Sequence, residues 1–155
     1  MTPLKIVIRL DRQRLYLCRG EEVLQSYPIS SSRFGAGCEP GSFKTPLGRF
    51  EIAEKVGGDQ PLNTVFRGRK PVVSEEPDWT SEPDLITSRI LWLNGLEAHN
   101  ANTKERFIYI HGTNQEALLA SPASHGCIRM ANADIDRLFN EVEPGTEVVI
   151  TPGDG

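Results

Sequence analysis

Apolar and polar residues alternate in short segments along most of the chain. Alternation with a period of two is typical of strands that are buried on one face. It predicts strands over these ranges: 4–10, 14–19, 22–30, 49–56, 89–93, 107–111 and 145–150. Only short polar turns separate the first three ranges, which favours an antiparallel meander at the start of the chain.

One segment near the C-terminus has helical spacing instead. Its apolar residues Ile135, Leu138 and Phe139 fall on one face of a helix predicted over 133–141, with Asn132 as the N-cap. Strands outnumber helices throughout. The sequence therefore predicts a mainly β fold, a sandwich or barrel-like domain with one or two short helices.

Two long stretches lack either period. Residues 31–48 are rich in Gly, Pro and Ser and are predicted to form a long ordered loop. Residues 57–84 alternate prolines with acidic residues, which indicates either a solvated connection or a lid with Trp79 as a substrate contact. His99 falls in the polar turn between two predicted strands, and we expect it to be an exposed turn residue.

Size and charge narrow the classes of protein. The chain of 155 residues, of which 38% are apolar, is predicted to form a single domain over 1–155 with one core. A net charge of −4 without a basic run argues against a nucleic-acid or anionic-membrane partner. No stretch is long and apolar enough to predict a membrane span.

The N-terminal residues alternate like a first strand and lack the apolar run of a secretory signal. Together with Met1 this predicts a cytoplasmic enzyme, or a periplasmic one if an export segment precedes residue 1. The chain has three cysteines, Cys18, Cys38 and Cys127. An odd number at irregular spacing does not predict a disulfide framework, which is consistent with a reducing compartment.

The candidate chemistry lies in two segments, Ser124-His125-Gly126-Cys127-Ile128-Arg129 and His111-Gly112-Thr113. If residues 125–129 are extended, His125, Cys127 and Arg129 share one face. In the strand 107–111, Tyr109 and His111 likewise share a face, while Ile108 and Ile110 are buried on the other. A cysteine near an imidazole is a candidate nucleophile because the imidazole favours the thiolate.

These segments resemble the L,D-transpeptidase (YkuD-domain) family, which has a His-Gly-Thr-like segment followed by Ser/Thr-His-Gly-Cys and then Arg or Asn. Thr45-Pro46-Leu47-Gly48-Arg49-Phe50 and the segment 87–93 are similar to further family motifs. The resemblance implies a Cys127 nucleophile, His111 as the base, a tautomer of His111 fixed by the carbonyl of Gly112, and no cofactor. It also implies acylation by carbapenems.

The remaining site residues follow from the chemistry of acyl transfer. The backbone amides of Gly126 and Cys127 are predicted to hold the oxyanion. Arg129, with its planar fork, is predicted to bind a substrate carboxylate, with a surface ion pair as the alternative. Ser124, as a residue that orients its neighbours, His125 and Tyr109 complete the predicted substrate-binding set.

The predicted partners are peptidoglycan stem peptides or muropeptides, and the protein is expected to be a monomer. By resemblance, Cys127 attacks the L-centre of the diamino acid in a tetrapeptide and expels D-Ala. The acyl group then passes to an amine, or to water in an L,D-carboxypeptidase of peptidoglycan recycling. Two other classes remain open: a zinc site made by His111, His125 and Cys127, and a non-catalytic peptide-binding module.

Overall fold

The structure, a computed structural model, describes residues 2–72 and 85–153. In these residues the chain forms ten strands, one α-helix and two 3-10 turns. The strands are β1 Leu4–Arg9, β2 Arg14–Arg19, β3 Glu22–Ser30, β4 Gly48–Val56, β5 Val65–Arg67, β6 Lys70–Pro71, β7 Ile86–Gly95, β8 Tyr109–Thr113, β9 Ile128–Met130 and β10 Glu147–Thr151. The helix is α1 Asn132–Glu141, and the turns are η1 Ala98–Asn100 and η2 Glu116–Leu118.

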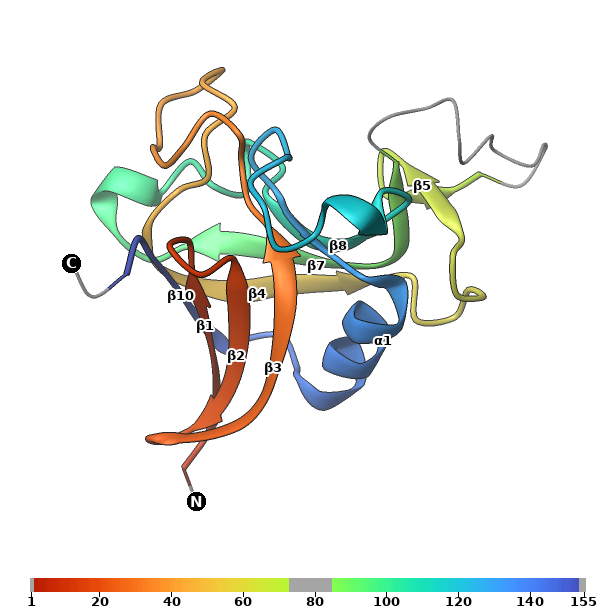
Figure 1. The fold of residues 1–155 in the computed structure, drawn as a ribbon, viewed down its shortest axis with the longest axis horizontal. Helices are drawn as coiled ribbons and strands as arrows, with labels where there is room; N and C mark the ends of the chain where they lie inside the picture. Colours follow the sequence, from red (N-terminus) through yellow and green to blue (C-terminus); the bar gives the residue numbers. More distant parts are fainter. Residues whose placement is uncertain (1, 73–84, 154–155) are drawn as a thin grey trace.

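The strands form one sheet in the order β4-β10-β1-β2-β3-β9-β8-β7-β5-β6, and β4 also pairs with β7. This last pairing closes the first eight strands of the order into a ring, with the β5–β6 hairpin attached to β7 (Figure 1). The strands β1, β2 and β3 are antiparallel neighbours, as the predicted meander requires. The prediction of a mainly β, barrel-like fold is confirmed.

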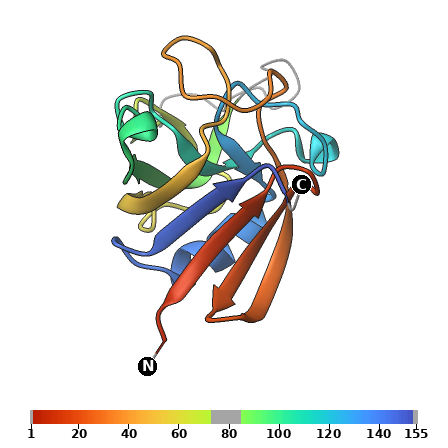
Figure 2. The ribbon, with the colours of Figure 1, turned by 90° about the vertical axis from the view of Figure 1, so that its left-hand side faces the viewer.

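Two parallel pairings interrupt the antiparallel pattern. The last strand, β10, lies parallel to the first, β1 (Figure 2). The strands β8 and β9, which carry the two candidate motifs, are also parallel neighbours. Parallel strands need a long connection, and the chain between β8 and β9 supplies it with the turn η2 and the motif loop.

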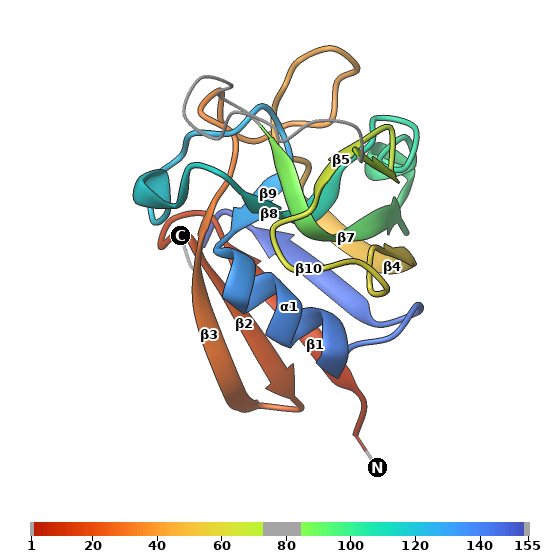
Figure 3. The same cartoon turned by 90° about the vertical axis from the view of Figure 1, so that its right-hand side faces the viewer.

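The main core fills the ring. Apolar side chains of the strands and of α1 pack there, and the most deeply buried include Phe50, Ile6, Ile8, Leu93 and Ile110. The helix α1 packs against β7 and β8 and contributes Ile135, Leu138 and Phe139 to this core (Figure 3). The predicted apolar face of the helix is therefore confirmed.

A smaller apolar cluster lies outside the main core. It consists of Phe66 on β5, Ile90 on β7 and Tyr109 on β8, and Cys127 packs against it. The face of β8 that carries Tyr109 is thus also buried, because β5 and β7 cover it. The absence of regular structure predicted over 57–84 is wrong for the hairpin β5–β6. The lid hypothesis with Trp79 lies outside the described residues.

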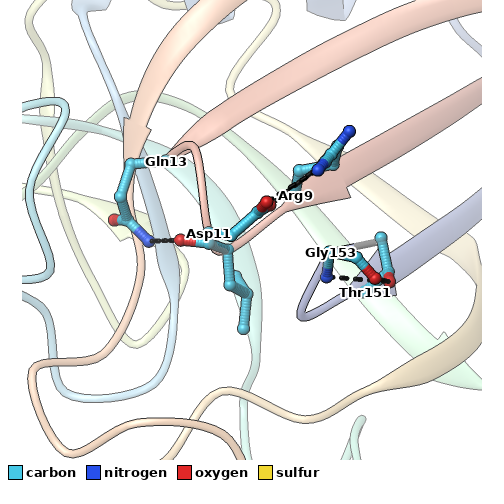
Figure 4. A network of polar contacts seen from close by, with 6 residues as sticks. Arg9, Asp11, Gln13, Thr151 and Gly153 are labelled. Carbon is cyan, nitrogen blue, oxygen red and sulfur yellow. Dashed lines mark hydrogen bonds and ion pairs between the residues drawn. The ribbon is translucent and has the colours of Figure 1, made fainter. Parts of the chain in front are cut away.

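The turn between β1 and β2 supports the start of the long loop. Arg9 pairs with the carboxylate of Asp11 at 2.6 Å, and this bond lowers the pKa of that carboxyl group (Figure 4). The side chain of Gln13 donates to the Ser31 hydroxyl at 2.8 Å and accepts the Ser31 N–H at 2.9 Å. The polar contacts of this turn therefore fix residue 31, where the loop 31–47 begins.

Candidate active site

The pairing of β8 with β9 brings the two motifs together. Ile110 pairs with Ile128 and His111 with Arg129. The two isoleucines point into the main core, so His111 and Arg129 lie on the opposite face. Cys127 comes two residues before Arg129, at the level of Tyr109. Cys127 lies just before β9 and packs against the cluster that contains Tyr109, a residue on the same face of β8 as His111.

The thiol of Cys127 is held by backbone groups of the segment that leads into β8. It accepts a hydrogen bond from the N–H of Tyr109 at 3.3 Å and donates one to the carbonyl of Phe107 at 3.3 Å. The side chain is half-buried. The N–H of Tyr109 can bond the sulfur in either protonation state, whereas the bond to the Phe107 carbonyl needs the thiol hydrogen. The half-buried thiol therefore has two backbone hydrogen-bond partners.

The ring of His111 is 2% exposed, and its Nδ1 lies 2.5 Å from the carbonyl oxygen of Gly112. A carbonyl oxygen can only accept, so Nδ1 carries the hydrogen and Nε2 of the neutral ring keeps its lone pair. This is the tautomer that a general base at Nε2 needs. The contact is the one that the resemblance implies for Gly112.

Gly112 has no room for a side chain. A Cβ at this position would lie 2.5 Å from Oδ1 of Asn132 and 2.7 Å from the backbone oxygen of Thr87. Real Cβ atoms essentially never show such contacts. A glycine is therefore required for β8 to pack this closely on β7 and α1, and the close packing fixes the carbonyl that holds His111.

A buried polar network behind Gly112 is the main feature that the sequence did not predict. Asn132, which is 4% exposed, accepts at Oδ1 from the hydroxyls of Thr87 (2.6 Å) and Ser88. Its Nδ2 donates to the carbonyl of Thr113 at 2.9 Å and to the Glu116 carboxylate at 2.7 Å. The network joins β7, β8, η2 and α1 around the position of the base.

The predicted N-cap role of Asn132 is wrong. Asn132 is the first residue of α1, the N-cap is Ala131, and no side chain of the N-cap residue caps the helix. The carboxylate of Glu116 takes that role, because it accepts the Asn132 N–H at 2.9 Å. A carboxylate at a helix N-terminus satisfies a free N–H and opposes the positive end of the helix dipole.

The motif loop is held from within and from the loop 31–47. The hydroxyl of Ser124 donates to the carbonyl of Cys127 at 2.6 Å and accepts the N–H of Gly126 at 3.2 Å. The hydroxyl of Thr45 donates to the carbonyl of Gly126 at 3.0 Å, and Thr45 is fully buried. Ser124 thus orients its neighbours, and Thr45 braces the loop that carries the nucleophile.

The extended conformation predicted for 125–129 is wrong at its start. Residues 125–127 form bends, Gly126 has a φ of 128°, and β9 begins only at Ile128. His125 is exposed, and its ring packs at 5.9 Å from Phe34 and 6.0 Å from Phe43, both in the loop 31–47. The bend at Gly126 therefore separates His125 from the strand that carries Arg129.

The structure buries two of the predicted substrate-binding side chains. Arg129 is 2% exposed, and its Nη1 donates to the side chain of Gln115 at 3.0 Å. Tyr109 is 4% exposed, and its hydroxyl accepts from Arg69 at 2.9 Å. Burial raises the pKa of the Tyr109 phenol, which keeps it protonated. The substrate-binding roles of Arg129 and Tyr109 stay predictions. Tyr109 contacts the Cys127 thiol through its backbone N–H.

Other expectations concern metals and membranes. In the described part of the chain, no group of three or more His, Cys, Asp or Glu residues is placed to hold a metal ion, so the zinc alternative gains no support. None of the helices described is long and apolar enough to cross a membrane. His99 is exposed, as expected, and its Nε2 lies 2.9 Å from the carbonyl of Leu47.

A profile of the L,D-transpeptidase catalytic domain (YkuD) matches residues 3–150. The chain belongs to the L,D-transpeptidase family. Among curated members, YkuD of Bacillus licheniformis is 49% identical over 150 residues, which cover 97% of this chain and 67% of that protein. YqjB of Bacillus subtilis is 45% identical over 107 residues, which cover 69% of this chain and 52% of that protein.

Solved L,D-transpeptidases share the fold. An L,D-transpeptidase from Mycobacterium smegmatis has a TM-score of 0.63 at 17% identity, with 97% of this chain and 59% of that chain covered. The L,D-transpeptidase LdtMt1 in complex with imipenem has a TM-score of 0.61 at 18% identity, with the same coverage of 97% and 59%. The chain thus spans about half to two thirds of the length of these relatives.

Proposed function

We propose that this member of the L,D-transpeptidase family is a cysteine acyl-transfer enzyme that acts on the stem peptides of peptidoglycan. The observation that carries the proposal is the 2.5 Å contact between Nδ1 of His111 and the carbonyl of Gly112. It leaves Nε2 as the proton acceptor, on the face of the sheet that also carries Cys127. The likeness of the chain to L,D-transpeptidases supports the substrate class.

In the proposed reaction, Nε2 of His111 takes the thiol proton, and Sγ of Cys127 attacks the carbonyl of the L-centre in the diamino acid. The tetrahedral intermediate collapses when His111 returns the proton to the amine of D-Ala, which leaves, and a thioester remains. An amine or a water molecule then attacks the thioester and gives a proton to His111, and the thiolate is released.

The oxyanion of the intermediate needs a donor. The N–H of Gly126, one of the two predicted donors, is directed at Ser124 at 3.2 Å. We therefore propose the N–H of Cys127 as the principal donor, because it belongs to the residue that attacks the carbonyl. One such donor contributes about 10²–10³-fold to the rate of comparable reactions.

A product assay tests the proposal. The protein is incubated with a disaccharide tetrapeptide, with and without a D-amino acid as acceptor, and D-Ala and the products are measured. We expect release of D-Ala that Cys127→Ala abolishes and that His111→Ala lowers by about 10²–10⁴-fold. Cys38→Ala, which changes a half-buried thiol outside the site, serves as the control and keeps the activity.

The same assay decides the acceptor. Exchange products or cross-linked dimers indicate transfer to an amine, whereas tripeptide as the sole product indicates an L,D-carboxypeptidase. If the folded wild-type protein releases no D-Ala under either condition, the proposed function is wrong.

A further inference from the structure

An arginine lies on aromatic side chains next to the nucleophile. Arg69 comes from the turn between β5 and β6, and its guanidinium lies 4.5 Å above the ring of Trp92 and 5.2 Å from that of Phe107. Its Nη1 donates to the hydroxyl of Tyr109 at 2.9 Å. Two aromatic rings and one hydrogen bond therefore fix the plane of this guanidinium.

The backbone around Arg69 is held in an unusual conformation. Gly68 has a φ of 58° and Arg69 a φ of 66°, both in the left-handed region. A two-residue turn of this kind joins the strands tightly and favours Asn or Gly at both positions. A non-glycine residue in this region costs about 1 kcal/mol or more, and such residues cluster at ligand sites. The turn places an arginine where glycine is the less strained residue.

The aromatic residues under Arg69 also hold the thiol. The carbonyl of Phe107 accepts from Sγ of Cys127, and the N–H of Tyr109 donates to it, both at 3.3 Å. Arg69 therefore stands over the two residues whose backbone positions the nucleophile.

The charges near this site differ in how they are paired. Lys104 lies 4.9 Å from the same Trp92 ring and forms an ion pair with Glu54 at 3.2 Å. Arg69 is half-buried and forms no ion pair with a carboxylate among the described residues. A planar guanidinium that is partly desolvated on aromatic faces binds carboxylates well, because it offers a rigid pair of donors.

We propose that Arg69, stacked on Trp92 and Phe107, binds a carboxylate of the acyl-donor peptide and selects anionic substrates at Cys127. This inference rests on the proposed function for the identity of the peptide. Two carboxylates of a stem peptide are candidates, the terminal one of D-Ala and the side-chain one of the diamino acid. Both present the same chemistry to the guanidinium, and the experiment separates them.

The first experiment needs no peptidoglycan substrate. Cys127 is alkylated with iodoacetate, which carries a carboxylate, and with uncharged iodoacetamide, and the modified peptide is quantified by mass spectrometry. We expect Arg69→Gln to lower the iodoacetate-to-iodoacetamide rate ratio by about three- to tenfold at low ionic strength. Arg69→Lys keeps most of the ratio. Lys104→Gln is the control and leaves the ratio unchanged. It removes a cation that lies near the same Trp92 ring but is already paired with Glu54.

The second experiment measures kcat and KM for four donors: a tetrapeptide with a diaminopimelate side-chain carboxylate, the same peptide with lysine at that position, and the C-terminal amide of each. We expect Arg69→Gln to lower kcat/KM by about tenfold to a hundredfold for donors that carry the recognised carboxylate. For donors that lack this carboxylate, Arg69→Gln changes kcat/KM little. The carboxylate whose removal from the donor abolishes the effect of Arg69→Gln is therefore the one that Arg69 binds.

An equal loss for all four donors, or an unchanged alkylation ratio in Arg69→Gln, overturns the inference and leaves Arg69 with a structural role. If the wild-type protein cleaves none of the donors, the proposed function fails by itself. The alkylation ratio then still decides whether Arg69 forms an anion site beside Cys127.

Discussion

Replacing Gly112 by alanine tests whether close packing of β8 positions the base. The added Cβ would lie 2.5 Å from Oδ1 of Asn132, 2.7 Å from the oxygen of Thr87 and 2.9 Å from the Thr87 hydroxyl. Ordinary contacts are about 3.5–4.0 Å, so an atom must move by roughly 1 Å. The backbone oxygen of Thr87 cannot yield locally because Thr87 pairs with Gly112 across β7 and β8.

The strain has a predicted magnitude. Overpacking costs about 1–3 kcal/mol of unfolding free energy, which corresponds to a fall in Tm of about 2–12 °C for a domain of this size. A 1 Å displacement of the Gly112 carbonyl also moves the ring of His111. Misplacement of a catalytic group by this distance lowers kcat/KM by about 10²-fold.

Two measurements check the prediction: Tm by calorimetry, and the rate of Cys127 alkylation by iodoacetamide as a function of pH, alongside release of D-Ala. Gly145→Ala is the matched control, because Gly145 has a φ of 95° but no atom within 4 Å of the added Cβ. It should lower Tm without changing the alkylation profile. If Gly112→Ala keeps both Tm and the alkylation profile of the wild type, the close packing of β8 does not position His111.

Three further perturbations concern the thiol and the polar contacts around it. A carbapenem should give one covalent adduct, on Cys127, in mass spectrometry. Cys18 should not react, because it is 8% exposed and burial raises the pKa of its thiol. An adduct on Cys18 alone would contradict this prediction. Thr45→Val leaves the carbonyl of Gly126 without its hydroxyl donor. It should lower the unfolding free energy, measured by chemical denaturation, by about 1–3 kcal/mol, and it should also lower the acylation rate. An unchanged acylation rate would show that this hydrogen bond does not position the nucleophile. Asn132→Ala removes three buried side-chain hydrogen bonds and a part-buried one to Glu116, and it should lower the unfolding free energy by about 2–4 kcal/mol. A loss below about 0.5 kcal/mol, within the range of ordinary surface changes, would mean that the network contributes little.

Local sequence patterns were sufficient to predict strands that are buried on one face and exposed on the other. The ranges predicted for β2 and β3 agree with the structure, and the range for β4 differs by one residue. The hairpin β5–β6 was missed because its strands are two or three residues long and lie in a polar, proline-rich stretch. Such strands exist because β7 offers them a partner, which is information that the local sequence does not contain.

The candidate site divides in the same way. The residue types marked Cys127 as a candidate nucleophile near an imidazole, and the family resemblance supplied the roles predicted for His111 and Gly112. The burial of Arg129 and Tyr109 depends on β5, β7 and the turn η2, which are distant in sequence. Asn132 was assigned to the helix end because asparagine is common there, and its buried partners come from three other elements. Long-range packing therefore decides which of these side chains are buried, and the local motif does not contain that information.

The parallel pairing of β1 with β10 also determines when the domain can form during synthesis. Lys5 pairs with Glu147, and Arg9 with Thr151, so the ring of strands contains contacts between the two ends of the chain. Contacts of such large sequence separation slow folding. The ring cannot close before β10 is available for pairing, so β1 and β4 each expose an edge until then. We therefore expect the incomplete ring to be prone to aggregation through those two edges.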